Sequence, residues 1–213
     1  MFTHLLIATL SLALTTQAAA ARGFATAPAA SQEERIGHRN DDRARLRKVL
    51  AARRAKNLAA FRAYVRAGRY PHNQLTPGEL NIWIDAAGNK CAAATMIWAS
   101  GARDLVTQVA ADDNAIRLAT VTAGPLLDWI VTSGLTHDEV VLIQRPFIGR
   151  PGGPPRPLPG RPLVDWRLAA DRALRVKYDA ILRELERSRA ASLDAAVDAL
   201  VAHPELVASL LGR

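Results

Sequence analysis

Cysteine is nearly absent from this chain, because Cys91 is the only one among 213 residues. A single thiol cannot form an internal disulfide, so the fold has to be stabilised by packing. The chain also lacks an HExxH or CxxC metal motif, a GxSxG elbow, a phosphate-binding loop and a dinucleotide-binding fingerprint. We therefore expect no metal site and no cofactor.

Aromatic residues are scarce as well, at 5% of the chain, whereas hydrophobic residues of all kinds make up 49%. That share is enough for one ordinary core, and the excess of alanine and leucine favours helix over strand. We predict a mainly α fold, in which a helical bundle surrounds a buried central helix beside a small β-hairpin-like element.

The N-terminus has the pattern of a secretory signal peptide over residues 1–21. A short apolar block, Leu5 to Leu14, precedes a run of small residues, and cleavage after Ala20 or Ala21 fits this pattern best. The block is too short for a membrane span, which needs ~20 apolar residues. We expect an exported protein, periplasmic or secreted. No Lys or Arg precedes Leu5, so an uncleaved anchor is the alternative.

The stretch from Asn81 to Gln144 organises the chain. Within it, Cys91 to Ala99 carries no charged side chain, which predicts a helix buried on all sides. Gly101 marks the end of this helix, since glycine readily takes the left-handed conformation there. Thr136 and Glu139 form a capping-box pattern that predicts another helix start.

A short strand is predicted just before the central helix, at Ile82 to Ile84. Its two isoleucines would lie on one side and Trp83 on the other. Asp85 to Asn89 has the composition of a tight turn. Two strands at most can form here, so any sheet must be small and packed by helices.

Composition divides the rest of the chain into segments. Residues 22–40 are interpreted as a flexible lead-in, and Asp41 or Asp42 is expected to cap the first helix. The core domain is expected at 41–148, a Pro/Gly/Arg linker at 149–162 and C-terminal helices at 163–213. A stripe beginning at Trp166 is expected to pack against the first helix or the central core. Helical spacing in the first helix is shown by Leu46, Leu50, Leu58, Phe61 and Val65.

Several short motifs occur in and around the central stretch. They are Ile84-Asp85-x-x-Gly88-x-x-Cys91-Ala92, Ser100-Gly101 with Leu105-Val106, Asn114, Leu127-x-Trp129, and Ser133-Gly134-Leu135-Thr136-x-x-Glu139-x-x-x-Ile143-Gln144. Together they resemble an uncharacterised family of small exported bacterial proteins, over the part of the chain from Leu58 to Pro146. The resemblance implies a shared fold unit and an exported location. No activity, cofactor or catalytic residue comes with it.

Charge is distributed unevenly. The formal net charge is +8, and Arg and Lys line the predicted first helix opposite its apolar residues. This suits an anionic polymer, an anionic membrane surface or a protein partner, and Arg binds phosphate and carboxylate well. Nucleic acid fits less well, because no aromatic residue interleaves with these cations before Phe61. A solvated basic face is the alternative. The candidate contact residues are Arg43, Arg47, Arg54, Arg62 and Arg66.

We therefore expect a non-catalytic interaction or envelope-associated module. The alternative is a Cys91-dependent enzyme or redox-reactive protein, in which a helix N-terminus favours the thiolate and His72 or His137 is the base. Three alanines follow Cys91, which favours its burial as a small hydrophobe. Candidates for lining a groove are Trp83, Trp129 and Gln144, with core packing as the other use of the tryptophans.

Overall fold

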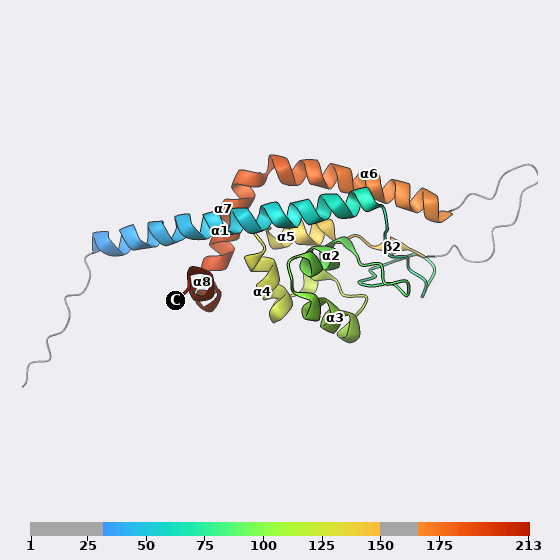
Figure 1. Ribbon diagram of the computed structural model, residues 1–213, viewed down its shortest axis with the longest axis horizontal. Helices are drawn as coiled ribbons and strands as arrows, with labels where there is room; N and C mark the ends of the chain where they lie inside the picture. The colour runs from blue at the N-terminus through green and yellow to red at the C-terminus, as the bar shows by residue number, and fades with distance from the viewer. Residues whose placement is uncertain (1–31, 150–165) are drawn as a thin grey trace, which may run out of the picture.

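The computed structural model describes residues 32–149 and 166–213 (Figure 1). The expected signal peptide, and most of the expected lead-in and linker, lie outside these residues. The described residues form eight α-helices, one 3-10 helix and two short strands, which confirms the predicted mainly α fold. The elements in chain order are α1 (Gln32–Ala67), β1 (Glu79–Leu80), α2 (Ala92–Ala99), α3 (Arg103–Asp112), η1 (Leu118–Thr120), α4 (Pro125–Thr132), α5 (His137–Ile143), β2 (Phe147–Ile148), α6 (Trp166–Arg187), α7 (Arg189–Val201) and α8 (Pro204–Leu211).

The helix α1 is the spine of the molecule. It has 36 residues and is about 54 Å long, and the other elements lie along it (Figure 1). Its predicted apolar stripe is buried from Leu46 to Val65. The helix already contains residues 32–40, so the prediction that Asp41 or Asp42 caps it is wrong. Gln, Glu and Arg favour helix even where no apolar period reveals one.

The helix α2 is the buried central helix that the uncharged run predicts. Ala92, Ala93, Ala94, Met96 and Ile97 are all fully buried. The helix ends at Ser100, and Gly101 follows with a φ of 100°, as its sequence predicts. Side chains from α1, α3, α4, α5 and α6 join α2 in the main hydrophobic cluster.

Four aromatic rings connect α1 to α6 within this cluster. Phe61 and Tyr64 on α1, Tyr70 just after it, and Tyr178 on α6 lie with ring centroids 5.2 to 5.7 Å apart. Edge-to-face and tilted pairs at this distance are favourable beyond their buried area. The predicted α6 stripe therefore packs against the central core, through Tyr178, Ile181 and Leu185.

A second, smaller cluster lies further towards the N-terminal end of α1. There Leu46 and Leu50 pack against the buried face of α7, and partly buried apolar side chains of α8 join them. The C-terminal helices thus share α1 with the core: α6 covers one part of the spine and α7 with α8 cover another (Figure 1).

The regular β structure lies outside the predicted strand. Its two strands are antiparallel, and they lie just before and just after the central stretch Asn81 to Gln144. Such a pairing joins segments that no local pattern connects, so the sequence does not reveal it. The register places Glu79 opposite Ile148 and Leu80 opposite Phe147.

The predicted strand at Ile82 to Ile84 forms one isolated antiparallel bridge, between Ile84 and Lys90, across the expected turn. This is a hairpin-like element in its simplest form. Ile82 and Trp83 are both buried, at 3% and 1% exposure. Trp83 can enter the core because its indole Nε1 donates to the carbonyl oxygen of Val106 at 3.0 Å.

The helices are too short or too polar to be membrane spans. None of those at 32–149 or 166–213 is both long enough and apolar enough to cross a bilayer.

Candidate functional site

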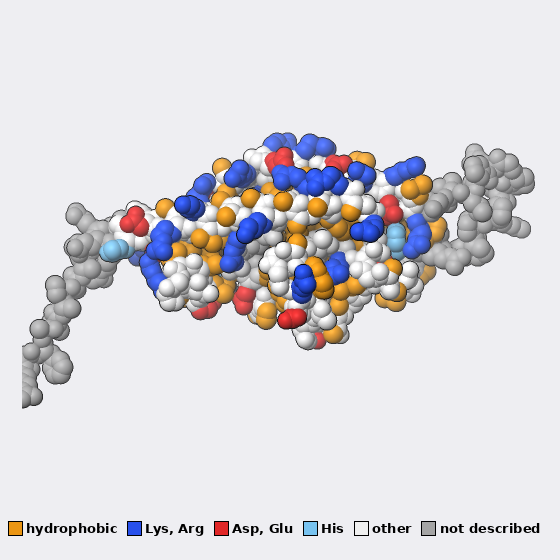
Figure 2. All heavy atoms as spheres, in the orientation of Figure 1, with side chains coloured by type: hydrophobic (Ala, Val, Ile, Leu, Met, Phe, Trp, Pro, Cys, Tyr) orange, Lys and Arg blue, Asp and Glu red, His pale blue; other side chains and the backbone are white. Residues whose placement is uncertain are grey.

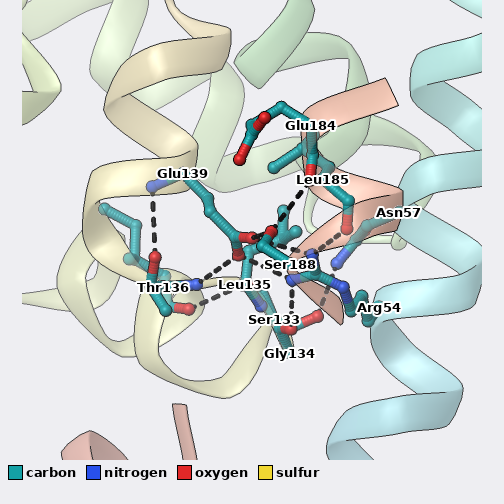
Figure 3. A network of polar contacts seen from close by, with 11 residues as sticks. Arg54, Asn57, Ser133, Gly134, Leu135, Thr136, Glu139, Glu184, Leu185 and Ser188 are labelled. Carbon is teal, nitrogen blue, oxygen red and sulfur yellow. Dashed lines mark hydrogen bonds and ion pairs between the residues drawn. The ribbon is translucent and has the colours of Figure 1, made fainter. Parts of the chain in front are cut away.

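The side chain of Arg54 lies inside the protein and is 1% exposed. Its Nη1 and Nη2 donate to the two carboxylate oxygens of Glu139, at 2.6 and 2.7 Å. They also donate to the carbonyl oxygens of Gly134, at 3.2 Å, and Leu185, at 2.7 Å (Figure 3). Arg54 therefore links α1 to the α4–α5 turn and to α6. Its assignment as a contact residue is wrong, because the guanidinium is used within the fold.

Glu139 is ionised in this buried position because its hydrogen bonds outweigh the cost of burial. Burial raises the pKa of the Glu139 carboxyl. The hydrogen bonds from Arg54 and from the backbone N–H of Thr136 lower this pKa by more than burial raises it, so it lies below the ordinary value. The Thr136 N–H donates at 2.9 Å, and the Thr136 hydroxyl in turn accepts from the Glu139 N–H at 3.2 Å. The predicted capping box is thus confirmed, and its carboxylate also neutralises Arg54.

Three more of the candidate arginines face acids on the C-terminal helices. Their side chains remain 40 to 45% exposed, so each pair is partly hydrated. Pairs of this kind stabilise a protein by about 0–1 kcal/mol, and they reduce the positive charge offered to a partner. The pairs are Arg43 with Asp198, Arg47 with Asp194 at 2.7 Å, and Arg62 with Glu186.

The remaining candidate, Arg66, belongs to an exposed row of residues on α1, which we call the outer stripe. The stripe consists only of cations and alanines, and no Asp or Glu occurs anywhere between Arg43 and Gly78. Figure 2 shows Lys and Arg side chains spaced along α1 and α6 on this face. The outer stripe comprises Arg45, Lys48, Ala52, Ala55, Lys56, Ala59, Ala63 and Arg66.

Cys91 is the N-cap of α2 and is 1% exposed. Its Sγ accepts a hydrogen bond from the Ala94 N–H at 3.4 Å. Burial raises the pKa of the thiol to about 12, against a smaller opposing effect of backbone hydrogen bonds. The helix N-terminus therefore does not activate this thiol, because desolvation dominates.

The two histidines considered as bases are engaged elsewhere. His137 Nε2 lies 2.7 Å from the carbonyl oxygen of Leu118. His72 Nε2 lies 3.9 Å from a carboxylate oxygen of Asp171. Neither ring forms a hydrogen bond with Cys91 in the described part of the chain. This geometry favours the interpretation of Cys91 as a small core residue.

Labelling of the thiol checks that placement. We expect iodoacetamide to modify Cys91 in the native protein at pH 8 at least about a hundredfold more slowly than in urea, since a buried thiol is neutral and out of reach. The measurement is the alkylation rate by mass spectrometry across pH. Fast native labelling, with a midpoint below the ~8.5 of a free thiol, would contradict the burial.

Polar side chains of the central stretch hold the loops of that stretch in place. The Asn114 side chain binds both backbone polar groups of Ile84. Its Oδ1 accepts from the Ile84 N–H at 2.9 Å, and its Nδ2 donates to the Ile84 carbonyl at 2.8 Å. Asp85 Oδ1 accepts from the N–H groups of Ala87, at 2.9 Å, and Asn89, at 2.8 Å. These side chains satisfy backbone groups that lie outside helices, so their role is structural.

Gln144 has the same kind of role. Its Oε1 accepts from the Leu118 N–H at 2.8 Å, and its Nε2 donates to the Ile116 carbonyl at 2.9 Å. Together with the burial of Trp83, this removes two of the three candidates for lining a groove.

Trp129, the third candidate, does line a hollow. The hollow lies between α1, α4 and the end of α2 and has a volume of about 440 Å³. Arg53 and Lys56 from α1 form one side of it, and Trp129 with Ser100 forms another. None of the described residues that line it is acidic. The sequence places both cations on the basic helix, but it does not reveal that they face a tryptophan more than 70 residues away.

No protein-family model matches this chain, and neither a curated protein nor a solved structure matches it. The resemblance to a family of exported proteins stays a prediction. Function has to be inferred from the geometry of the outer stripe and the hollow.

Proposed function

We propose that this protein is an exported, non-catalytic binding module that attaches to an anionic polysaccharide of the bacterial envelope. The contact surface is the outer stripe of α1. The observation that carries the proposal is the composition of this stripe: four cations and four alanines, with no acid. Burial of Cys91 supports a binding role over a thiol-dependent reaction.

The outer stripe suits an extended polymer. Arg45 and Arg66 are 21 positions apart, which corresponds to about 32 Å along the helix. Alanine side chains between the cations are short, so a chain of carboxylates or phosphates can approach the helix closely. Among the described residues, the four cations of the stripe form no ion pair with an acid, unlike Arg43, Arg47 and Arg62. Their charge is therefore available to a partner.

A membrane surface fits the outer stripe less well. Helices that lie in the bilayer interface insert large apolar side chains such as Trp, Phe or Leu beside their cations. The leucine, phenylalanine and tyrosine side chains of α1 belong to the two hydrophobic clusters instead, and the apolar residues of the stripe are all alanine. Attraction to anionic vesicles without insertion is the competing outcome of the test.

Binding to polygalacturonate tests the proposal with the full-length chain. We expect affinity to fall steeply between about 50 and 500 mM salt, because screening weakens contacts between exposed charges. The triple variant Arg45→Gln, Lys48→Gln, Arg66→Gln should bind about tenfold more weakly at low salt, since three contacts of roughly 0.5 kcal/mol each are lost. Isothermal titration or biolayer interferometry measures both effects.

The matched control has the same loss of three charges. The variant Arg43→Gln, Arg47→Gln, Arg62→Gln removes arginines that already face acids, so we expect its affinity to change by less than about threefold. Equal losses in the two triple variants would mean that net charge, and not the stripe, determines binding. Absence of salt-dependent binding by the unmodified chain, or preferential binding to phosphatidylglycerol vesicles, would contradict the proposal.

A further inference from the structure

We infer that the hollow beside Trp129 binds one acidic sugar unit of that polysaccharide. This inference rests on the proposed function and specifies it: the outer stripe attracts the polymer, and the hollow recognises its repeating unit. Lys56 belongs to both, because it lies on the stripe and lines the hollow. A polymer lying along α1 therefore passes the mouth of the hollow.

Trp129 presents a fixed apolar wall. It is half-buried, and its indole Nε1 donates to Ser100 Oγ at 2.9 Å. The same hydroxyl donates to the Ile97 carbonyl at 2.7 Å, so both members of the pair are oriented from within the fold. With its one donor already used, the indole can offer a ligand only its rings. A flat apolar surface of this kind packs against the C–H face of a sugar ring.

The part of the hollow lined by α1 presents positive charge. Arg53 Nη1 donates to the Thr132 carbonyl at 3.1 Å, which holds the guanidinium at this position and leaves its other N–H groups for a ligand. Lys56 lies three positions further along α1, on the same side of the helix. Its ammonium forms no ion pair with any residue in 32–149 or 166–213.

Two other polar side chains of the hollow already donate hydrogen bonds within the fold. Asn57 Nδ2 donates to the Ser133 carbonyl at 2.9 Å, and the Thr132 hydroxyl donates to the Asp128 carbonyl at 2.7 Å. The features of the hollow that suit an anionic ligand are an aromatic face and two cations. A sugar ring that carries a carboxylate or a phosphate matches both features. The volume of about 440 Å³ lies within the ~300–1,000 Å³ of small-ligand sites.

Oligosaccharide binding by the full-length chain tests this inference. The probes are a tetrasaccharide of galacturonate, a neutral tetrasaccharide of glucose, glucose 6-phosphate and inorganic phosphate. We expect the acidic tetrasaccharide to bind at least about tenfold more tightly than the neutral one or than phosphate alone. A gain for glucose 6-phosphate over phosphate would assign the anion as a sugar phosphate, and a gain for galacturonate alone would assign it as a carboxylate.

Variants on the two sides of the hollow provide the decisive comparison. Trp129→Leu and Arg53→Gln should each weaken binding of the acidic tetrasaccharide about tenfold, and Trp129→Phe, which keeps a ring, should retain most of it. The matched control is Trp98→Leu, because Trp98 is also half-buried but Lys90 Nζ already lies over its ring, 4.2 Å from the centroid. Each variant is compared with the unmodified chain by its thermal unfolding curve.

The two proposals fail in different ways. If Trp129→Leu binds the acidic tetrasaccharide as well as the unmodified chain does, or if the neutral tetrasaccharide binds equally well, the inference about the hollow is wrong. Salt-dependent binding of polygalacturonate that depends on the outer stripe would still support the proposed function. Tetrasaccharide binding that depends on Trp129, without any effect of the stripe triple variant on the polymer, would overturn the role of the stripe alone.

Discussion

Replacing Arg54 with methionine is expected to destabilise the protein by about 3–5 kcal/mol, the range found when one member of a buried ion pair is removed. Glu139, 8% exposed, would keep its charge without a counter-ion. The carbonyl oxygens of Gly134 and Leu185 would also lose a donor. Urea unfolding at pH 7, followed by circular dichroism, measures the loss.

Two further variants separate the pair from its surroundings. Arg47→Met removes an α1 arginine from an exposed pair with Asp194 and should cost less than about 1 kcal/mol. The double variant Arg54→Met, Glu139→Met should be more stable than Arg54→Met alone, because no unpaired charge is left in the core. A cost for Arg54→Met no larger than that for Arg47→Met would contradict the buried role of Arg54.

The pH dependence of stability gives an independent readout of the same pair. The pKa of Glu139 is lowered in the folded protein, so its charge stabilises the fold above the unfolded value of about 4.3. That contribution is lost as the pH falls through the lower, folded pKa. The stability difference between the unmodified chain and Glu139→Gln should therefore be full at neutral pH and shrink in acid.

Replacing Gly134 with alanine is expected to have an effect of similar size, about 4 kcal/mol or more, which places it among exceptional substitutions. A Cβ at this position would lie 2.1 Å from the Leu50 carbonyl oxygen and 2.8 Å from the backbone nitrogen of Arg54, both on α1. The φ of 81° adds the cost of a left-handed conformation. Relief of the clash requires the α4–α5 turn to move away from the spine. Thermal and urea unfolding measure the loss.

Gly101→Ala is the matched control for this substitution. Gly101 has a φ of 100°, but a Cβ added there would meet no heavy atom within 4 Å, so only the backbone conformation is penalised. We expect a cost of about 1–2 kcal/mol. The difference between the two alanine variants then measures the close approach of the turn to α1. Equal costs would mean that the turn is not held against the helix.

Local patterns in the sequence predict the parts of the fold that depend on neighbouring residues. The uncharged run at Cys91 to Ala99 predicts a buried helix, because its hydrophobicity leaves no face for solvent. The capping box of Thr136 and Glu139 is predictable because both of its members lie within one turn. The structure confirms both the buried helix and the capping box.

The contacts that the sequence does not reveal join distant residues. Arg54 lies four positions after Leu50 and four before Leu58, so helical spacing places it on the buried face of α1. The sequence does not reveal its partner, Glu139, which is 85 residues away. The acids opposite Arg43, Arg47 and Arg62 lie on helices more than 120 residues further along. A basic face on one helix therefore cannot be divided into paired and available charges from sequence alone.

The hollow beside Trp129 illustrates the same limit for the candidate site. Trp129 is one of three groove candidates, and nothing in its local sequence distinguishes it from Trp83, which is buried. The distinction comes from α1, which places Arg53 and Lys56 in the lining of the same hollow as Trp129. The two tryptophans differ in the side chains that surround them in the folded protein, which their local sequences do not show.

The use of α1 as a shared spine also affects how the chain folds. Helical proteins usually fold fast because most of their contacts are local in sequence. Here the spine is bound through contacts that span 80, 131 and 155 residues, from Arg54 to Gly134, Arg54 to Leu185 and Arg43 to Asp198. Closing such loops costs entropy before any apolar surface is buried. We therefore expect docking of the spine to limit the folding rate, with α2 uncovered until that step is complete.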